Sequence, residues 1–536
     1  MKAPVNVYYE LKGFYQVGAS TVAESQNHRL YVNSRDDNQL RGEEVDLSTL
    51  KSNCGNKTMD GDRILNPCGS VANSLFNDIY TLVSPMTLTL NESHIAWNSD
   101  LPAWLFHAQL PPPSFVFDAS VAGITWVDLV FPFFLFSMGA AFPLSLGRRL
   151  DRGDPPRRIV VSILKRGLLL AFFAVALGNT GLWTLDAVLQ RPVVSALVTM
   201  TVWGAFFAMF VRIPGFIPRQ NGWLNAGGIA VLAVLMGVYR WLGVGVSVVR
   251  SDIIILILAD VVVAGSLIWW LTRRNLWLRM GIVALIAALK LGAAVPGSWN
   301  EAVWNFSPVP WLFRTEFLQY LCIVLPGSVA GDLFARWLAR GQQEERPALS
   351  GQIAAAGLTA LLLAVNMWGL FTRTLTLNLV LTLALGTAAW MLLRKPRTGI
   401  ESLLYRLFTT GFFWLLLGLA FESLEEGVKK DPATVSYFFI TAGMASHVLL
   451  VTSVLLRKGR SRGGLLVLCG QNPMIAYTAA GYVVVPLLVF ADRAVALPWL
   501  WGQCGCVMGV GRGVIVTLLM MLFTAAFTRS KIFWRT

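Results

Sequence analysis

One histidine of this chain lies where it can do acid–base or acyl-transfer chemistry. His107 stands in PAWLFHAQ (Pro102–Gln109), shortly before a long apolar run. An imidazole can act as a general base near neutral pH, and it can also accept an acyl group as a nucleophile. The alternative interpretation is an interfacial histidine in the aromatic belt of a membrane protein. The residue type alone leaves both interpretations open.

Two further groups of residues can bind a substrate that is rich in oxygen atoms. Gln471 and Asn472 open an apolar run at GQNPMIAY (Gly470–Tyr477). At a helix N-terminus they either cap the helix or point amide donors at a substrate oxygen. The loop 296–314 is rich in aromatic residues, which stack on sugar rings but also populate membrane interfaces. The substrate-binding candidates are therefore Gln471, Trp299, Trp304 and Arg314.

Several ionisable residues fall inside or at the mouth of apolar runs, where they are costly and hence functional candidates. Asp128 in TWVDLVFP (Thr125–Pro132) is the strongest, because it lies one turn into a run and close to a helix-breaking proline. His447 is better explained as a hydrogen-bonded core residue. The others are Glu316 and four residues that we expect to snorkel or to pair across helices, namely Asp260, Lys290, Asp332 and Arg373.

Composition and missing motifs narrow the class of protein. The chain has 536 residues, a mean hydropathy of +0.58 and 14% charged residues, against about 25% in soluble domains. This composition argues against an ordinary soluble enzyme, a disordered protein and a nucleic-acid-binding module. No Walker loop, Rossmann glycine pattern, HExxH or paired CxxC occurs, and Cys504 and Cys506 have no nearby ligand partners. We therefore predict no metal site and no nucleic-acid partner.

The elements that must position these residues are membrane helices. Long apolar runs alternate with short polar ones from residue 119 onward, without the alternation of a barrel strand. We predict an all-α polytopic membrane protein of about 11–13 transmembrane helices, preceded by a small, partly β, extramembrane N-terminal fragment. The runs are 121–146, 159–180, 193–211, 223–242, 251–271, 276–295, 315–337, 350–371, 374–393, 403–421, 433–456, 471–490 and 513–528.

Charge divides the chain near residue 100 and orients it in the bilayer. Residues 1–100 hold 8 Lys+Arg and 12 Asp+Glu, and residues 101–536 hold 36 and 18. In the second part, one set of alternate loops together with the tail holds 26 Lys+Arg and the opposite set holds 9. Because basic loops stay in the cytoplasm, the C-terminus is predicted inside and residues 1–120 outside. Topology alone explains the +14 net charge.

Residues 101–536 resemble the bacterial relatives of heparan-α-glucosaminide N-acetyltransferase. The resemblance rests on LPAWLFH (Leu101–His107), GITWVDLVFPFFLFSMG (Gly123–Gly139), YLCIVLPG (Tyr320–Gly327) and GQNPMIAY (Gly470–Tyr477). It implies a multi-helix acyltransferase that moves acetyl from cytoplasmic acetyl-CoA to a glucosamine amine on the outer side. His107 then occupies the position of the family's functional histidine.

The resemblance also assigns roles to the other candidates. The catalytic set becomes His107, Asp128 and Asn472, with acetyl-CoA as co-substrate. Cations for the CoA phosphates would come from one basic loop, although topology explains these residues equally well: Arg148, Arg149, Arg157, Arg158 and Lys165. The acceptor would be an amino sugar or a glycan. Whether acetyl rests on the histidine and whether the protein forms homo-oligomers are left open.

Residues 6–100 resemble another family, the ectodomain of the non-catalytic β subunit of phospholipid flippases. Three blocks carry this resemblance in order: Asn6–Gln16, Asn27–Gly42 and Asn66–Asp78. It implies an exoplasmic fragment that assists a P-type ATPase, with a disulfide between Cys54 and Cys68. The sequons at Asn56 and Asn91 would carry glycans.

The seam near residue 100 leads to competing functions. We interpret the chain as a chimera of a flippase-subunit fragment, 1–100, and an acyltransferase-like domain, 101–536. Neither helix that anchors the flippase subunit is recognised, nor a signal peptide, nor the helix that usually opens the acyltransferase family. The functions to be weighed are a membrane acetyltransferase, a flippase accessory subunit and a transporter without covalent chemistry. A fusion and an assembly artefact both explain the seam.

Overall fold

The chain forms two compact units, Met1–Leu101 and Pro102–Thr536. The computed structural model describes residues 59–60, 63–64, 122–340, 349–458, 464–495 and 506–534. In the first unit it describes two short antiparallel strands, β1 (Met59–Asp60) and β2 (Arg63–Ile64), with Met59 opposite Ile64. Five predicted site residues lie outside the described residues: Cys54, Cys68, Asn56, Asn91 and His107.

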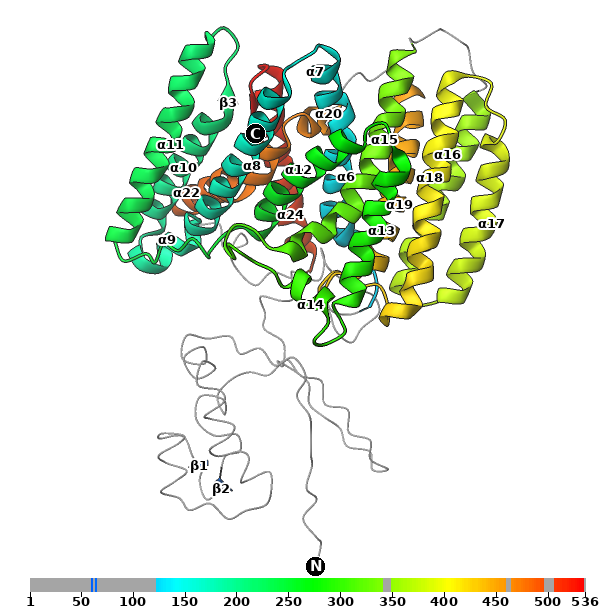
Figure 1. The fold of residues 1–536 in the computed structure, drawn as a ribbon. Helices are drawn as coiled ribbons and strands as arrows, with labels where there is room; N and C mark the ends of the chain where they lie inside the picture. The colour runs from blue at the N-terminus through cyan, green and yellow to red at the C-terminus, as the bar shows by residue number, and fades with distance from the viewer. Residues whose placement is uncertain are drawn as a thin grey trace, which may run out of the picture. The chain divides into compact units, whose positions relative to one another are not determined.

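The second unit is built from long apolar helices (Figure 1). Within the described residues, 11 helices are long and apolar enough to cross a membrane. They comprise η3 (Val127–Leu129) with α6 (Val130–Phe142), π-helical η4 (Pro143–Gly147) and α7 (Arg148–Asp151), then α8 (Pro156–Asn179), α10 (Pro192–Phe210), α11 (Pro218–Trp241), α12 (Ile253–Thr272), η5 (Thr315–Tyr320) with α15 (Leu321–Ala339), α16 (Leu349–Phe371), α17 (Leu375–Leu393), α18 (Gly399–Glu422) with η6 (Ser423–Glu425), α19 (Val435–Lys458), and α21 (Pro473–Ala479) with π-helical η7 (Ala480–Val484) and α22 (Val485–Val495).

The remaining described elements are not among these 11 spans. They are α9 (Leu182–Leu189), β3 (Val211–Arg212), α13 (Leu276–Gly292), α14 (Trp299–Trp304), α20 (Leu465–Gly470), α24 (Cys506–Arg529) and β4 (Phe533–Trp534). The predicted all-α polytopic fold is confirmed. Each predicted run coincides with a helix, although α13 and α24, which match the runs 276–295 and 513–528, are not among the 11. The short helices α9, α14 and α20 were not predicted.

Helix starts follow from local chemistry. The Asp252 and Asn275 side chains accept hydrogen bonds from Ile255 N and Leu278 N, both at 3.0 Å, and so satisfy free N–H groups at the starts of α12 and α13. Other helices begin with proline at the first position, where no N–H is needed, as at Pro156 in α8. These signals place the connections at the two ends of the bundle.

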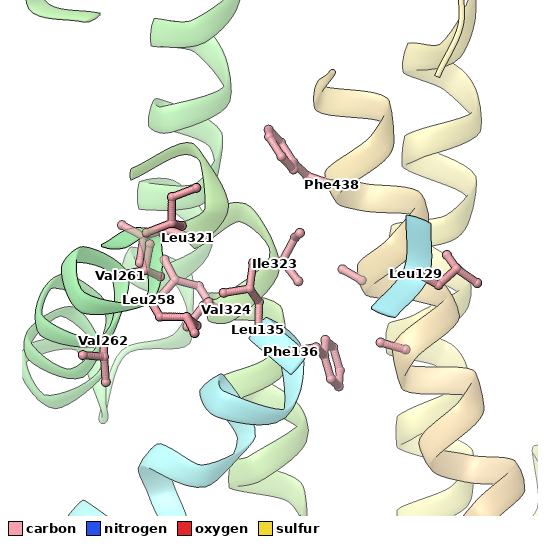
Figure 2. Close-up of a cluster of buried hydrophobic side chains, with 14 of the residues drawn as sticks. Leu129, Leu135, Phe136, Leu258, Val261, Val262, Leu321, Ile323, Val324 and Phe438 are labelled. Carbon is pink, nitrogen blue, oxygen red and sulfur yellow. The ribbon is translucent and has the colours of Figure 1, made fainter. Parts of the chain in front are cut away.

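Helices α6 and α15 approach each other closely in the core. A β carbon on Gly139 would overlap the carbonyl oxygen of Val324, and one on Gly327 would overlap that of Phe136. Glycine therefore allows the two backbones to touch, as small residues do between membrane helices. Leu135 and Phe136 of α6 pack beside this seam, next to residues of α12, α15 and α19 (Figure 2).

Large apolar side chains also face outward on several spans. On α11, Trp223 and Val234 are 69% and 66% exposed. In water such a surface would be an aggregation patch, whereas in a bilayer it is the surface that lipid covers. The exposed apolar surface and the helix lengths together make this unit an integral multi-pass membrane domain.

Candidate functional site

Asp128 is held in a buried setting at the start of the first span. Its side chain is 3% exposed, and Oδ2 accepts hydrogen bonds from Thr125 N at 2.9 Å and from Thr125 Oγ1 at 2.7 Å. The other oxygen, Oδ1, lies 3.4 Å from Lys430 Nζ. A carboxylate that is removed from water needs such a partner. The structure thus pairs Asp128 with a lysine that is 302 positions later in the chain.

Aromatic side chains close the site around this pair. Tyr437 OH donates to the main-chain oxygen of Asp128 at 2.7 Å. Tyr320 packs edge-on against Phe131 and Phe438, with ring centroids at 5.4 and 5.5 Å. These rings come from α6, η5 and α19, whose packing therefore fixes the position of the carboxylate.

Lys290, at the end of α13, lies beside the same aromatic group. Its Nζ donates to Gln319 Oε1 at 2.7 Å and lies 5.3 Å from the ring centre of Trp304 and 5.8 Å from that of Phe438. A cation over aromatic faces is stabilised by the ring quadrupole. Lys290 therefore links Trp304, in the short helix α14, to the aromatic side chains that surround Asp128.

The loop that follows α18 carries Lys430 and is itself anchored. Both carboxylate oxygens of Glu425 accept backbone N–H groups at the start of α19, from Val435 at 2.8 Å and Ser436 at 2.7 Å. Arg373 pairs with the buried Glu422 at the other side of this loop. The loop also binds the segment before Asp128, through Gly123 N to Val428 O at 2.8 Å. We call Asp128, Lys430, Tyr437, Tyr320 and Lys290 the Asp128 site.

The Asp128 site places a carboxylate beside an ammonium group. Thr125 fixes the orientation of the carboxylate through two hydrogen bonds, and such a fixed charge can attract a cationic or hydrogen-bond-donating group such as an amine. Glu316, predicted from its place at a span mouth, lies near the site and pairs instead with Arg314 at 3.2 Å. Sequence reasoning singled out Asp128 and expected Lys290 to snorkel or to pair across helices. It missed Lys430, Tyr437 and Tyr320, since a lysine in a polar loop and tyrosines in apolar runs are common.

Gln471 and Asn472 lie away from the Asp128 site. Asn472 is fully buried, and its side chain forms hydrogen bonds with Ile532 O and Trp534 N, on either side of Phe533. Gln471 is exposed. Helix α20, which precedes them, lies toward the end of the unit that carries α7, whereas α14 is at the opposite end (Figure 1). Their predicted role at a substrate oxygen stays a prediction, and the structure does not bring them to Asp128.

The aromatic loop and the basic loop also lie at opposite ends of the helical unit (Figure 1). At the α14 end, Trp299 is 68% exposed, Trp304 contacts Lys290, and Arg314 is exposed. At the α7 end, Arg149 pairs with Asp154 at 3.0 Å and donates to Ser162 at 3.1 Å. The other predicted CoA-contacting residues there are exposed: Arg148, Arg157, Arg158 and Lys165. Among the described residues, no three histidine, cysteine or acidic side chains converge to hold a metal.

The fold and the site define an integral multi-pass helical membrane protein with a buried carboxylate–lysine pair at one end. Two family models match successive parts of the chain. The LEM3 (ligand-effect modulator 3) family / CDC50 family matches residues 1–120, and a domain of unknown function (DUF5009) matches residues 77–334. The two matches overlap over 77–120, which includes the predicted seam. The resemblance of the N-terminal part to a flippase subunit is thereby supported.

Curated relatives match the N-terminal part of the chain. The "ALA-interacting subunit 3" of Arabidopsis thaliana is 42% identical over 101 residues, 19% of this chain and 26% of the relative. The "Cell cycle control protein 50A" of Mus musculus is 38% identical over 104 residues, 18% and 26%. The "Phospholipid-transporting ATPase accessory subunit CDC50" of Chaetomium thermophilum is 38% identical over 97 residues, 17% and 21%. The chain spans about a quarter of the length of these relatives.

Proposed function

We propose that the helical unit is a transmembrane acyltransferase that moves acetyl from cytoplasmic acetyl-CoA to an amine on the outer side. The acceptor is an amino sugar or a glycan that bears one. The observation that carries the proposal is the Asp128 site, in which a fixed carboxylate faces a lysine beneath an aromatic wall. The sequence resemblance of residues 101–536 to acetyltransferases supports the same chemistry.

The proposed reaction uses one end of the unit for each substrate. The basic loop around Arg149 binds the CoA phosphates in the cytoplasm, since phosphates are bound by guanidinium groups and basic loops remain inside. His107 takes a proton from the acceptor amine as the amine nitrogen attacks the acetyl carbonyl. The C–S bond of acetyl-CoA then breaks, and CoA leaves as a thiol that takes up this proton. Alternatively, His107 first displaces CoA and carries the acetyl group to the amine. The negative charge of Asp128 orients the polar groups of this site. Trp304 and Trp299 provide stacking surfaces for a sugar.

The test is acetyl transfer by the full chain in proteoliposomes, with radiolabelled acetyl-CoA and glucosamine supplied on either side. We expect acetylglucosamine to form, and we expect its rate to fall about 100-fold or more in His107→Ala and Asp128→Asn. Glu426→Gln is the matched control, because this acid is exposed and lies in the same loop as Lys430. Loss of transfer in the control, or full activity in Asp128→Asn, would contradict the assignment.

The comparisons favour a second function for the N-terminal part alone. Its relatives include a protein named as an accessory subunit of a phospholipid-transporting ATPase, so we propose that residues 1–100 contact an ATPase of this type. Co-expression with a tagged flippase ATPase tests this. We expect co-purification that is lost when residues 1–100 are deleted and kept in Asp128→Asn, so the two proposed functions fail separately.

A further inference from the structure

The segment Ile532–Trp534 folds back from the end of α24 into the helical unit. Lys531 adopts a left-handed conformation with φ of +56°, and its N–H donates to Thr528 O at 3.0 Å. Ile532 N donates to Phe527 O at 3.0 Å, which completes the reversal. The next two residues form β4, which pairs antiparallel with β3, with Val211 opposite Trp534 and Arg212 opposite Phe533.

The other edge of this segment is bound by one side chain. Asn472 Nδ2 donates to Ile532 O at 2.9 Å, and Asn472 Oδ1 accepts from Trp534 N at 3.0 Å. Backbone groups of residues two apart point to the same edge of a strand, so this amide occupies the place of a neighbouring strand. Thr528 also accepts from Asn472 Nδ2 at 3.1 Å. The segment is thus hydrogen-bonded on both edges, by β3 and by Asn472.

A cage of aromatic rings holds the side chain at the centre of the contact. Trp534 is 4% exposed and stacks on Phe210 with ring centroids 5.5 Å apart. The other members of the cage approach Trp534 at 5.7 to 6.3 Å: Phe173, Trp203 and Phe207. Phe533, on the opposite face of the strand, is only half-buried. The cage therefore holds the side chain of Trp534, and the side chain of Phe533 lies outside it.

These features are those of strand addition to a peptide-binding groove. In that mode, main-chain hydrogen bonds supply affinity and pockets for alternate side chains supply specificity. The groove is made by α8, α10, β3 and Asn472, and its hydrogen bonds to the segment come from β3 and Asn472. We propose that this groove is a binding site for an extended peptide with a tryptophan anchor, and that Ile532–Trp534 is its ligand in cis and exchanges with the same sequence in trans.

The test uses the full chain in lipid nanodiscs and hydrogen exchange of the amides of Arg212 and residues 532–534. The Val211 amide is left out, because it donates to Phe207 O at the end of α10. Because the cage holds most of the binding energy, Trp534→Ala should speed exchange at least about 100-fold by removing a buried indole. Phe533→Ala is the matched control and should change it less than about tenfold, since this ring lies outside the cage. Equal effects of the two substitutions would overturn the proposal.

Exchange in trans is the decisive step. A synthetic peptide of residues 531–536, KIFWRT, added to the Trp534→Ala chain should restore slow exchange at the Arg212 amide, and a peptide with alanine for the tryptophan should not. Failure of KIFWRT to protect this amide would show ordinary terminal packing and would refute the binding site. If Trp534→Ala does not fold, a photoreactive KIFWRT on the wild-type chain replaces it. Cross-linking at residues 211–212 that unlabelled KIFWRT competes away is expected, and none would again refute the site.

Discussion

The ion pair of Arg279 and Asp332 predicts an unequal response to removal of its two partners. Arg279 Nη1 donates to Asp332 Oδ2 at 2.6 Å, and the side chains are 1% and 24% exposed, respectively. Asp332→Asn leaves a cation that cannot reach water, whereas Arg279→Met leaves a carboxylate that can. We therefore expect Asp332→Asn to be the more destabilising substitution, although it alters the size and shape of the side chain less than Arg279→Met does.

The magnitudes follow from the remaining partners. Without Asp332, the Arg279 guanidinium keeps only neutral acceptors. These include the hydroxyl oxygen of Ser328, 3.1 Å from Nη1, and that of Thr272, 3.2 Å from Nε. Breaking a buried pair costs about 3–5 kcal/mol, and the partial exposure of Asp332 places this case near the lower end, at about 3 kcal/mol. Removing Arg279 should cost about 1–2 kcal/mol, since water can solvate the carboxylate that remains.

The assay is equilibrium unfolding in mixed micelles, followed by tryptophan fluorescence. Trp269 Nε1 donates to Asp332 Oδ1 at 3.2 Å, so this ring, one of the 20 tryptophans of the chain, contacts the pair. In the double variant Arg279→Met with Asp332→Asn, the free energy of unfolding should fall by about 2 kcal/mol, less than the sum of the single effects. If Arg279→Met were the costlier change, or if the two effects simply added, the burial argument would be refuted.

Two further predictions concern glycines, each with a matched control. Gly327→Ala would press a methyl group into the Phe136 carbonyl and should lower the free energy of unfolding by about 1–3 kcal/mol or more. The control, Gly357→Ala, lies on an open face of α16 and should be neutral or stabilising. Equal unfolding midpoints would contradict backbone contact between α6 and α15. Gly427 and Gly153 both have positive φ, +113° and +77°, but only Gly427 faces Ala122 and Arg373. Gly427→Ala should therefore lower the melting temperature more than Gly153→Ala, and equal or reversed effects would contradict the close contact at Gly427.

Apolar run length and loop charge predicted the helical body because a bilayer imposes both on the sequence. A span must be long and apolar whatever it packs against, so every predicted run coincides with a helix. The short helices α9 and α14 were missed because 8 and 6 residues leave no periodic signal. The all-α fold was thus readable from the sequence, whereas short connecting elements were not.

The candidate site was predicted only in part. Asp128 was found because a carboxylate within an apolar run is exceptional, but its partner Lys430 lies in a polar loop where lysine is ordinary. The same limit applies to Asn472, whose partners Ile532 and Trp534 are about 60 residues away and form no motif with it. Pairings over such distances depend on packing, which a single sequence does not record.

The docking of Trp534 has a consequence for the order of synthesis. Val211 is translated 323 residues before Trp534, a delay of roughly 15–65 s at about 5–20 residues per second. During this interval the edge of β3 and the aromatic rings around it lack the strand that covers them, so their apolar surface stays exposed. Something else must cover that edge while the ribosome works, so slower translation should increase the demand on insertion chaperones for this protein more than for one whose contacts are all local.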